Sequence, residues 1–184
     1  MGEIKNSLIM IAFFTVLLGL IYPLTIMGIS QLAFPDQANG NLIKVNGTVV
    51  GSILIGQEFT SPQYFHGRPS ANDYNSSSSS GSNLGPTNQK LVDNVKQNME
   101  DIRTENFLQT NDSIPADLVE TSASGLEGYI YVNSAMIQVH RIAAERNISE
   151  SEVIKIIEDN KEIQFGTRSP IVNVLKLNIA LDKL

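Results

Sequence analysis

The sequence predicts an α+β protein, with a single N-terminal transmembrane helix followed by one compact soluble α+β domain. Three observations support this fold class. Residues 6–35 carry no charged side chain, two runs rich in Val and Ile flank the dipeptide Asn46-Gly47, and apolar residues recur at helical spacing beyond residue 90. We therefore divide the chain of 184 residues into an anchor, residues 1–35, and a soluble domain, residues 36–184.

The apolar core of the anchor covers residues 8–29. A helix of about 22 residues spans about 30 Å, which is the thickness of the bilayer hydrocarbon. A secretory signal would have a shorter apolar region, of about 7–15 residues, that ends in a small-x-small cleavage site. For cleavage after Ala33, the site would need a small residue two positions earlier, where the chain has Gln31. These features predict a retained membrane anchor.

Pro23 lies inside this apolar run. In water a proline breaks a helix, whereas in lipid a neighbouring helix can satisfy the carbonyl group that it frees. Gly19, Gly28 and Thr15 are small enough to allow close approach of another helix. The sequence leaves two alternatives open, a lone anchor with a kink and a helix that packs against other membrane helices.

The basic residues around the anchor predict its orientation. Lys5 and the amino terminus lie on the short side, and Lys44 is the nearest base on the other side. Because cytoplasmic flanks carry the excess of Lys and Arg, we expect the N-terminus in the cytoplasm and the soluble domain outside the cell.

The domain is expected to begin with a hairpin over residues 41–56, because Asn-Gly is the strongest short turn signal. A helix is then expected from Pro86 and Thr87 onward, with apolar residues at helical spacing: Leu91, Val92, Val95, Met99 and Ile102. A second helix is expected over residues 132–146, with one apolar face: Ala135, Met136, Val139, Ile142 and Ala143.

Two further elements are predicted near the C-terminus. Ser149 and Glu152 form a capping box for a third helix that continues through Ile156 and Ile157. Residues 171–181 are expected to begin as a strand and to end in a short helical turn.

Residues 74–89 have the composition of a flexible linker, with five consecutive serines and two glycines. The preceding residues 64–74 carry three aromatic rings, a histidine and an arginine, which linkers rarely do. The composition leaves two alternatives open, a slack tether and a folded loop that another protein contacts.

Composition excludes several classes of function. The net charge of −6 argues against a nucleic-acid binder, and the absence of cysteine excludes disulfide scaffolds and thiolate chemistry. The two histidines, His66 and His140, lack the spacing of a zinc site, and no serine-hydrolase or phosphate-loop motif is complete. The acidic residues between positions 93 and 127 are interpreted as a solvated surface. We therefore predict no catalytic residue and no metal site.

Several segments in a fixed order resemble the C subunit of the Kdp-type potassium-transporting P-type ATPase. Residues 20–23 read Leu-Ile-Tyr-Pro, as at the end of the membrane segment in that family. The matching segments in the domain are GSILIGQEF, YFHGRPSA, YN, SSGSNLGPTN, SASGL and VNVLKLNIALD. Each segment alone is a weak signal, and the six in sequence are specific.

The resemblance implies a membrane assembly of four parts. Its partners would be a channel-like subunit that selects potassium, a subunit that hydrolyses ATP and a small membrane subunit. The C subunit would be a non-catalytic accessory chain that is needed for assembly and activity of the pump. It would bind no cofactor alone, because ATP and potassium are handled by the complex.

The resemblance also suggests functional residues. Gln138 matches a family glutamine in a region proposed to contact nucleotide, and it is the candidate cofactor-binding residue. The predicted partner-contact residues are Gly19, Tyr22, Pro23, Arg68, Tyr74 and Asn83. The repeated order of motifs implies that the serine-rich loop is folded, with the serines at 76–80 as a slack insertion. Where the family usually reads Gly-Leu-Asp-Pro-His-Ile, residues 125–130 read Gly-Leu-Glu-Gly-Tyr-Ile, so no imidazole is available there.

Three hypotheses for function follow. An external domain would cap or brace the potassium entrance of the channel-like subunit, with its acidic stretch raising the local cation concentration. A cytoplasmic domain would raise the ATP affinity of the ATP-hydrolysing subunit, with Gln138 near the nucleotide. The alternative from another class is a free-standing membrane-anchored domain outside the cytoplasm that binds a solute or acts as a scaffold.

Overall fold

The computed structural model of the chain describes residues 2–163 and 169–184. The chain divides into two compact units, Met1–Val50 and Gly51–Leu184. The first unit contains the anchor and most of a hairpin, and the second contains the remaining elements. Helices and two small sheets among the described residues confirm the predicted α+β class. The domain boundary at residue 35 concerns the membrane anchor and stays a prediction.

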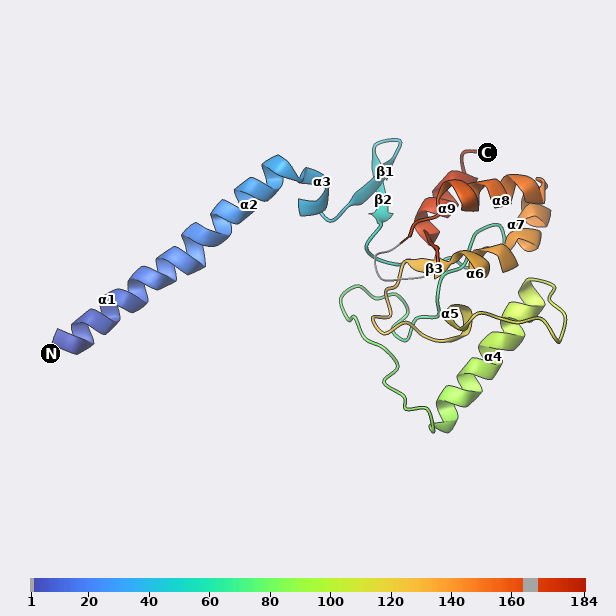
Figure 1. The fold of residues 1–184 in the computed structure, drawn as a ribbon, viewed down its shortest axis with the longest axis horizontal. Coiled ribbons are helices and arrows are strands. Elements are labelled where there is room, and N and C mark those ends of the chain that lie inside the picture. The colour runs from blue at the N-terminus through green and yellow to red at the C-terminus, as the bar shows by residue number, and fades with distance from the viewer. Residues whose placement is uncertain (1, 164–168) are drawn as a thin grey trace. The chain divides into compact units, whose positions relative to one another are not determined.

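The first unit is dominated by a helical rod, which confirms a helix long enough to span a membrane (Figure 1). It consists of α1 (Gly2–Val16), a π-helical turn η1 (Leu17–Ile21) and α2 (Tyr22–Ala33). These 32 residues have no buried side chain. At about 1.5 Å per residue the rod is about 48 Å long, so its ends would extend beyond the hydrocarbon.

The π-helical turn ends at Ile21, and only Tyr22 separates it from Pro23. Proline has no backbone N–H, and its ring collides with the carbonyl group four residues earlier, which here belongs to Gly19. The wider turn removes this collision, and the Tyr22 N–H reaches back five residues to the Leu17 carbonyl oxygen. The kink that the sequence suggested is thus a π-bulge.

The predicted hairpin forms, although it is shorter than residues 41–56. A short helix α3 (Pro35–Ala38), which the sequence did not predict, precedes β1 (Leu42–Val45) and β2 (Thr48–Ser52). Asn46 and Gly47 both have positive φ angles, 50° and 80°. Two positive φ angles characterise the type I′ turn, and Asn-Gly is the dipeptide that adopts it most readily.

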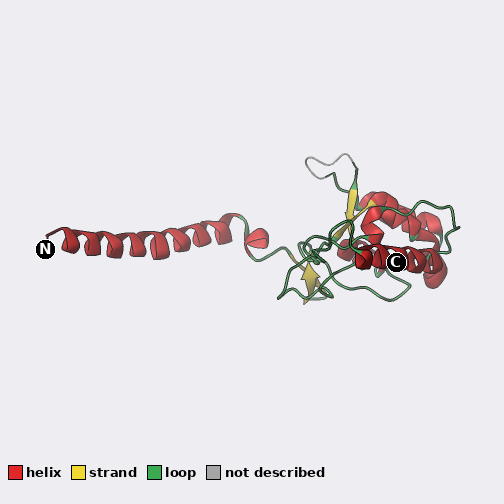
Figure 2. Cartoon of the chain, turned by 90° about the horizontal axis from the view of Figure 1, so that it is seen from below, coloured by secondary structure: helices red, strands yellow, loops and turns green. Residues whose placement is uncertain are grey.

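The second unit contains six helices and one two-stranded sheet among its described residues. The helices are α4 (Gln89–Glu105), α5 (Ala116–Val119), α6 (Val132–Ile137), α7 (Val139–Arg146), α8 (Glu150–Asp159) and α9 (Val174–Leu181). The strands are β3 (Tyr129–Tyr131) and β4 (Ile171–Asn173), which pair antiparallel with Ile130 opposite Val172. Long loops connect these elements, as Figure 2 shows.

The core of this unit lies among α6 to α9 and the small sheet. Fully buried side chains from each of these elements meet there, together with one ring from the loop before α4: Phe65, Ile130, Ala135, Ile142, Ile157, Val172 and Leu177. Burial of a large aliphatic side chain contributes about 1.5–3 kcal/mol, so this cluster is the main source of stability. α4 packs on α5 and buries no residue completely.

Two predicted helices differ in their bounds from the expectation. α4 begins at Gln89 rather than at Pro86, because the Asn88 side chain accepts a hydrogen bond from the Lys90 N–H and caps the helix there. The helix expected over residues 132–146 is interrupted at Gln138, which ends α6 and precedes α7. The capping box of Ser149 and Glu152 is confirmed.

The C-terminal segment confirms its mixed prediction and extends it. β4 ends at Asn173, whose side chain accepts from the Lys176 N–H and so caps α9. The helical part is eight residues long rather than a single turn. The Asn173 amide also donates to the Ile53 carbonyl oxygen at 3.0 Å, which holds the chain just after the hairpin.

Candidate functional site

The serine-rich loop is folded, as its motifs implied. The Ser70 hydroxyl donates to the Gly125 carbonyl oxygen at 2.7 Å and accepts from the Tyr74 N–H at 2.9 Å. The Asn72 amide donates to the carbonyl oxygens of Asn75 and Ser78. These side chains bond the backbone as turn-forming Ser and Asn residues do, and the bonds hold the loop in a folded arrangement.

The serines at 76–80 are part of this fold, which corrects their interpretation as a slack insertion. The Ser79 hydroxyl donates to the Ser124 carbonyl oxygen at 2.9 Å. Gly125 has a φ angle of 69°, and a Cβ atom there would come within 2.7 Å of the Ser80 carbonyl oxygen. The serine run therefore packs against the Ser-Ala-Ser-Gly-Leu segment, and only a glycine fits at that contact.

Arg68 and Tyr74, two of the predicted partner-contact residues, lie together. The Tyr74 hydroxyl donates to the Arg68 carbonyl oxygen. The Arg68 guanidinium donates through Nη2 to the carbonyl oxygens of Glu120 and Thr121, at 3.3 and 3.5 Å. Its Nε is buried and has no hydrogen-bond partner among the described residues. Arg68 thus holds the loop against the chain that follows α5, and Tyr74 closes the loop on its own backbone.

The surroundings of the Tyr74 phenol raise its pKa. Two causes raise the pKa of Tyr74 from 10.0 to about 12. Burial is the larger, and the charge of Glu58 is the second. Folding therefore favours the neutral phenol over the phenolate. The stability from this preference is fully present below pH 10 and is lost as the pH rises through 12.

We expect the Tyr74→Phe variant to lose this alkaline dependence. Between pH 10 and pH 12 the free energy of unfolding of the native chain should fall by about 2–3 kcal/mol more than that of the variant. Urea unfolding at several pH values measures the difference. The pKa values of Tyr64 and Tyr129 are also raised, and both phenols remain in both proteins, so the difference isolates Tyr74. Parallel curves would contradict the assignment.

Gln138, the candidate nucleotide-contact residue, is only 1% exposed. Its Oε1 accepts from the His66 N–H at 2.8 Å and from Arg141 Nη2 at 2.9 Å. Its Nε2 donates to the carbonyl oxygens of His66, at 3.1 Å, and Ser134, at 3.3 Å. Since an amide offers two donors and two acceptor positions, all four are used. A nucleotide contact at this residue stays a prediction and would require breaking one of these bonds.

Arg141 forms the centre of the same buried network and was missed by the sequence analysis. Its guanidinium is bonded to the Asn106 side chain at 3.1 Å, to the Tyr64 carbonyl oxygen at 3.0 Å and to the Pro62 carbonyl oxygen. The residue is 3% exposed. One sequence signal was available, because Gln138 and Arg141 stand on the apolar helix face between Ala135 and Ile142.

His66 lies at the edge of this network. Its Nδ1 is 3.3 Å from the Glu105 carboxylate and its Nε2 is 3.1 Å from the Ser61 carbonyl oxygen. Burial, and then the nearby charge of Arg141, lower the pKa of His66 below its ordinary value. The histidine thus connects the loop to the end of α4. Among the described residues no group of three or more His, Cys, Asp or Glu side chains has the arrangement to hold a metal ion.

A pocket opens beside His66 and Arg68, and most of the charged side chains in its lining are acidic. Three carboxylates, those of Glu58, Asp73 and Glu105, line it with Arg68 as the one opposing full charge. Such a surface attracts cations from solution without fixing one of them.

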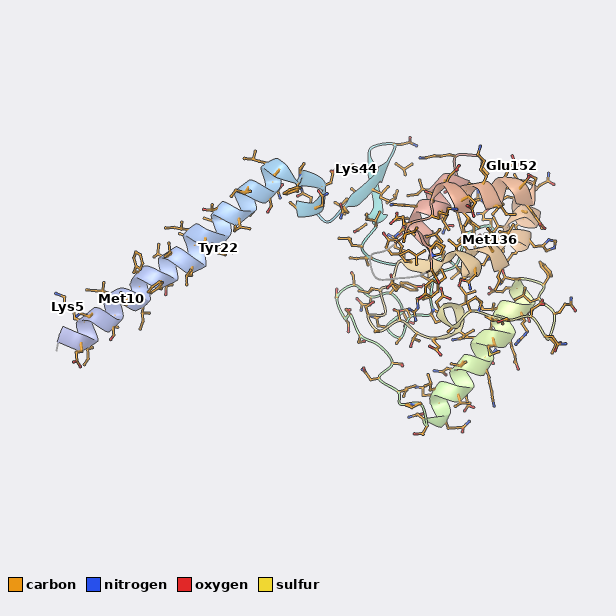
Figure 3. The ribbon with its side chains drawn as sticks, in the orientation of Figure 1. Lys5, Met10, Tyr22, Lys44, Met136 and Glu152 are labelled. Atoms are coloured by element: carbon orange, nitrogen blue, oxygen red, sulfur yellow. The ribbon has the colours of Figure 1, made fainter. Side chains whose placement is uncertain are left out.

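The remaining predicted contact residues are not members of this network. Gly19, Tyr22 and Pro23 are in the helical rod, where Tyr22 projects outward from its middle part (Figure 3). Asn83 is exposed and has a φ angle of 54°, which asparagine tolerates better than most residues. Gly128, which replaces the family's proline, is buried, and its carbonyl oxygen accepts a hydrogen bond from the Val174 N–H at 3.0 Å.

A family model described as "KdpC: K+-transporting ATPase, c chain" matches residues 4–183 of the chain. Curated proteins with the name "Potassium-transporting ATPase KdpC subunit" are similar over nearly their whole length. The protein of Koribacter versatilis is 47% identical, with 96% of this chain and 92% of that protein aligned. The protein of Mycobacterium bovis is 46% identical, with 99% and 98% aligned, and that of Rhodopseudomonas palustris is 41% identical, with 98% and 97% aligned.

Proposed function

Because this chain belongs to the KdpC family, the c chain of the K+-transporting ATPase, we propose that it places its soluble domain outside the cell, at the potassium entrance of the pump. The chain is an accessory subunit of the potassium pump and not its catalytic subunit. Family membership gives no support to the free-standing binding domain. The proposed partners are the channel-like subunit, the ATP-hydrolysing subunit and a small membrane subunit.

The burial and the hydrogen bonds of Gln138 support a location of the domain outside the cell. The four hydrogen bonds of its amide and its 1% exposure leave no atom with which to recognise a base or ribose. A nucleotide role would need a rearranged domain, whereas a bracing role uses the folded domain as it stands. The bias of basic residues around the anchor favours the same location.

The acidic surface supports a role near a cation pathway. The chain carries a net charge of −6, and three carboxylates line the pocket beside Arg68. An acidic surface at the entrance of a potassium channel raises the local cation concentration and speeds encounter. The effect is screened within about 8 Å at physiological ionic strength, so the surface has to lie close to the entrance to act.

Topology is tested by labelling a single cysteine. Ser151 lies exposed in the first turn of α8, next to Glu152, which projects from the surface in Figure 3. We expect Ser151→Cys to react with a membrane-impermeant maleimide in intact cells, because the domain is outside. The cysteine-free native chain is the blank, and Glu3→Cys at the other end of the rod should react only after the membrane is opened. The reverse pattern would contradict the proposal and support the nucleotide role.

The ATP dependence of the assembled pump gives a second readout. If the domain is outside, replacing Gln138 changes the apparent ATP affinity only where the substitution also unfolds the domain. The thermal melt of each Gln138 variant therefore has to accompany the ATP titration. A folded variant with weakened ATP affinity would contradict the external location.

A further inference from the structure

The π-bulge in the helical rod leaves a backbone acceptor without a helical donor. The Leu18 carbonyl oxygen has two possible donors, the N–H four residues later and the N–H five residues later. The first belongs to Tyr22 and bonds the Leu17 oxygen, and the second position is Pro23, which has no N–H. The wild-type sequence thus removes the partner of this carbonyl.

The described residues offer no other donor for this acceptor. The hydroxyl of Thr25 donates to the Ile21 carbonyl oxygen at 2.8 Å, and no side chain of the described residues donates to Leu18. The neighbouring Gly19 has no side chain, and a Cβ placed there would meet no atom within 4 Å. The backbone at Gly19, the residue next to this carbonyl, is therefore not covered by another side chain of the described residues.

The position of this acceptor makes the missing bond costly. Leu18 lies at the middle of the 32-residue rod, about 24 Å from either end, and so at the depth of the hydrocarbon core. Water is scarce at this depth and acyl chains carry no donor, which is why backbone groups in membranes are satisfied by protein. A proline is tolerated in such a helix where a neighbouring helix supplies the donor.

We propose that the Leu18 carbonyl oxygen is a docking point for a transmembrane helix of another pump subunit, which donates a hydrogen bond from a hydroxyl or amide side chain. This inference rests on the proposed assembly. The unassembled chain has an unpaired acceptor in lipid, and assembly pairs it, so the bond favours the complex. The partner approaches over Gly19, where the backbone is not covered by a side chain.

The first test is Pro23→Ala, which restores an N–H at residue 23 and closes the helical ladder. The Leu18 carbonyl oxygen is then paired in the unassembled chain, so assembly gains no hydrogen bond there. Interhelical hydrogen bonds in membranes are weak, so we expect a loss of about 3- to 10-fold in the fraction of chain that co-purifies with the potassium pump. Phe14→Ala is the matched control, because it removes more volume and leaves the ladder intact; it should lose less.

The second test observes the carbonyl itself. Leu-Gly occurs twice in the chain, at 18–19 and at 84–85, so leucine labelled with ¹³C at the carbonyl and glycine labelled with ¹⁵N give two correlated signals in solid-state NMR. We expect the Leu18 signal to move downfield between the chain alone and the assembled pump, as hydrogen bonding does to a carbonyl carbon. The Leu84 signal, from the soluble domain, is the internal reference.

The outcomes separate this inference from the proposed function. Pro23→Ala assembling at the wild-type level, or an unchanged Leu18 signal on assembly, would overturn the docking point alone. A Leu18 signal already downfield in the chain alone would assign the donor to a second copy of the chain or to water, and would also overturn it. Failure of the wild-type chain to co-purify would overturn the proposed function as well.

Discussion

Replacing Arg141 with methionine is expected to lower the free energy of unfolding of the soluble domain by about 4 kcal/mol. The methionine retains most of the apolar volume but offers no donor. Three acceptors then lose the donor that the described residues give them: the carbonyl oxygens of Pro62 and Tyr64 and the side-chain oxygen of Asn106. The Gln138 oxygen loses one of its two donors and keeps the His66 N–H. A buried acceptor without a donor costs about 1–3 kcal/mol, so a loss of this size is a conservative sum.

Urea unfolding of the native chain and of Arg141→Met measures this loss. Arg103→Met is the matched control, because Arg103 makes one long hydrogen bond, to the Asp112 carbonyl oxygen at 3.5 Å, and its Nε already lacks a partner. We expect the control to change the free energy of unfolding by less than about 0.5 kcal/mol. Equal changes in the two variants would show that the Arg141 network does not hold the loop to α7.

Deleting residues 1–33 is expected to reduce association with the pump by about 100-fold or more. The unit Gly51–Leu184 has its own core and should remain folded, so the loss would report the anchor. The membrane helix confines the chain to the bilayer that holds its partners, which raises the effective concentration of the domain, and its packing adds further binding energy.

Co-purification of the truncated chain with the pump measures this effect, and circular dichroism confirms that the domain is folded. A chain in which an unrelated membrane helix replaces residues 1–33 separates the two contributions. Full recovery by the substitute would mean that the helix is only a tether. Assembly of the truncated chain at the native level would show that the anchor does not contribute to assembly.

Short-range signals in the sequence determined several elements of this protein. Asn46-Gly47 produced the hairpin turn, because both residues tolerate a positive φ angle. Ser149 and Glu152 produced the helix start, because the two groups of a capping box are only three residues apart. The apolar composition of residues 8–29 predicted the rod. In each case the interaction that fixes the structure lies within the segment that shows the pattern.

The tertiary structure alone decided the rest. The strand β3 is only three residues long, too short for a periodic signal, and it exists because residues 129–131 pair with residues 171–173. The run of serines resembles a linker until its contact with Ser124 is seen. Gln138 and Arg141 bond groups 72 and 79 residues earlier in the chain. A buried polar side chain is stabilised by whichever partners folding brings to it, and a sequence pattern of three or four residues cannot name partners at that distance.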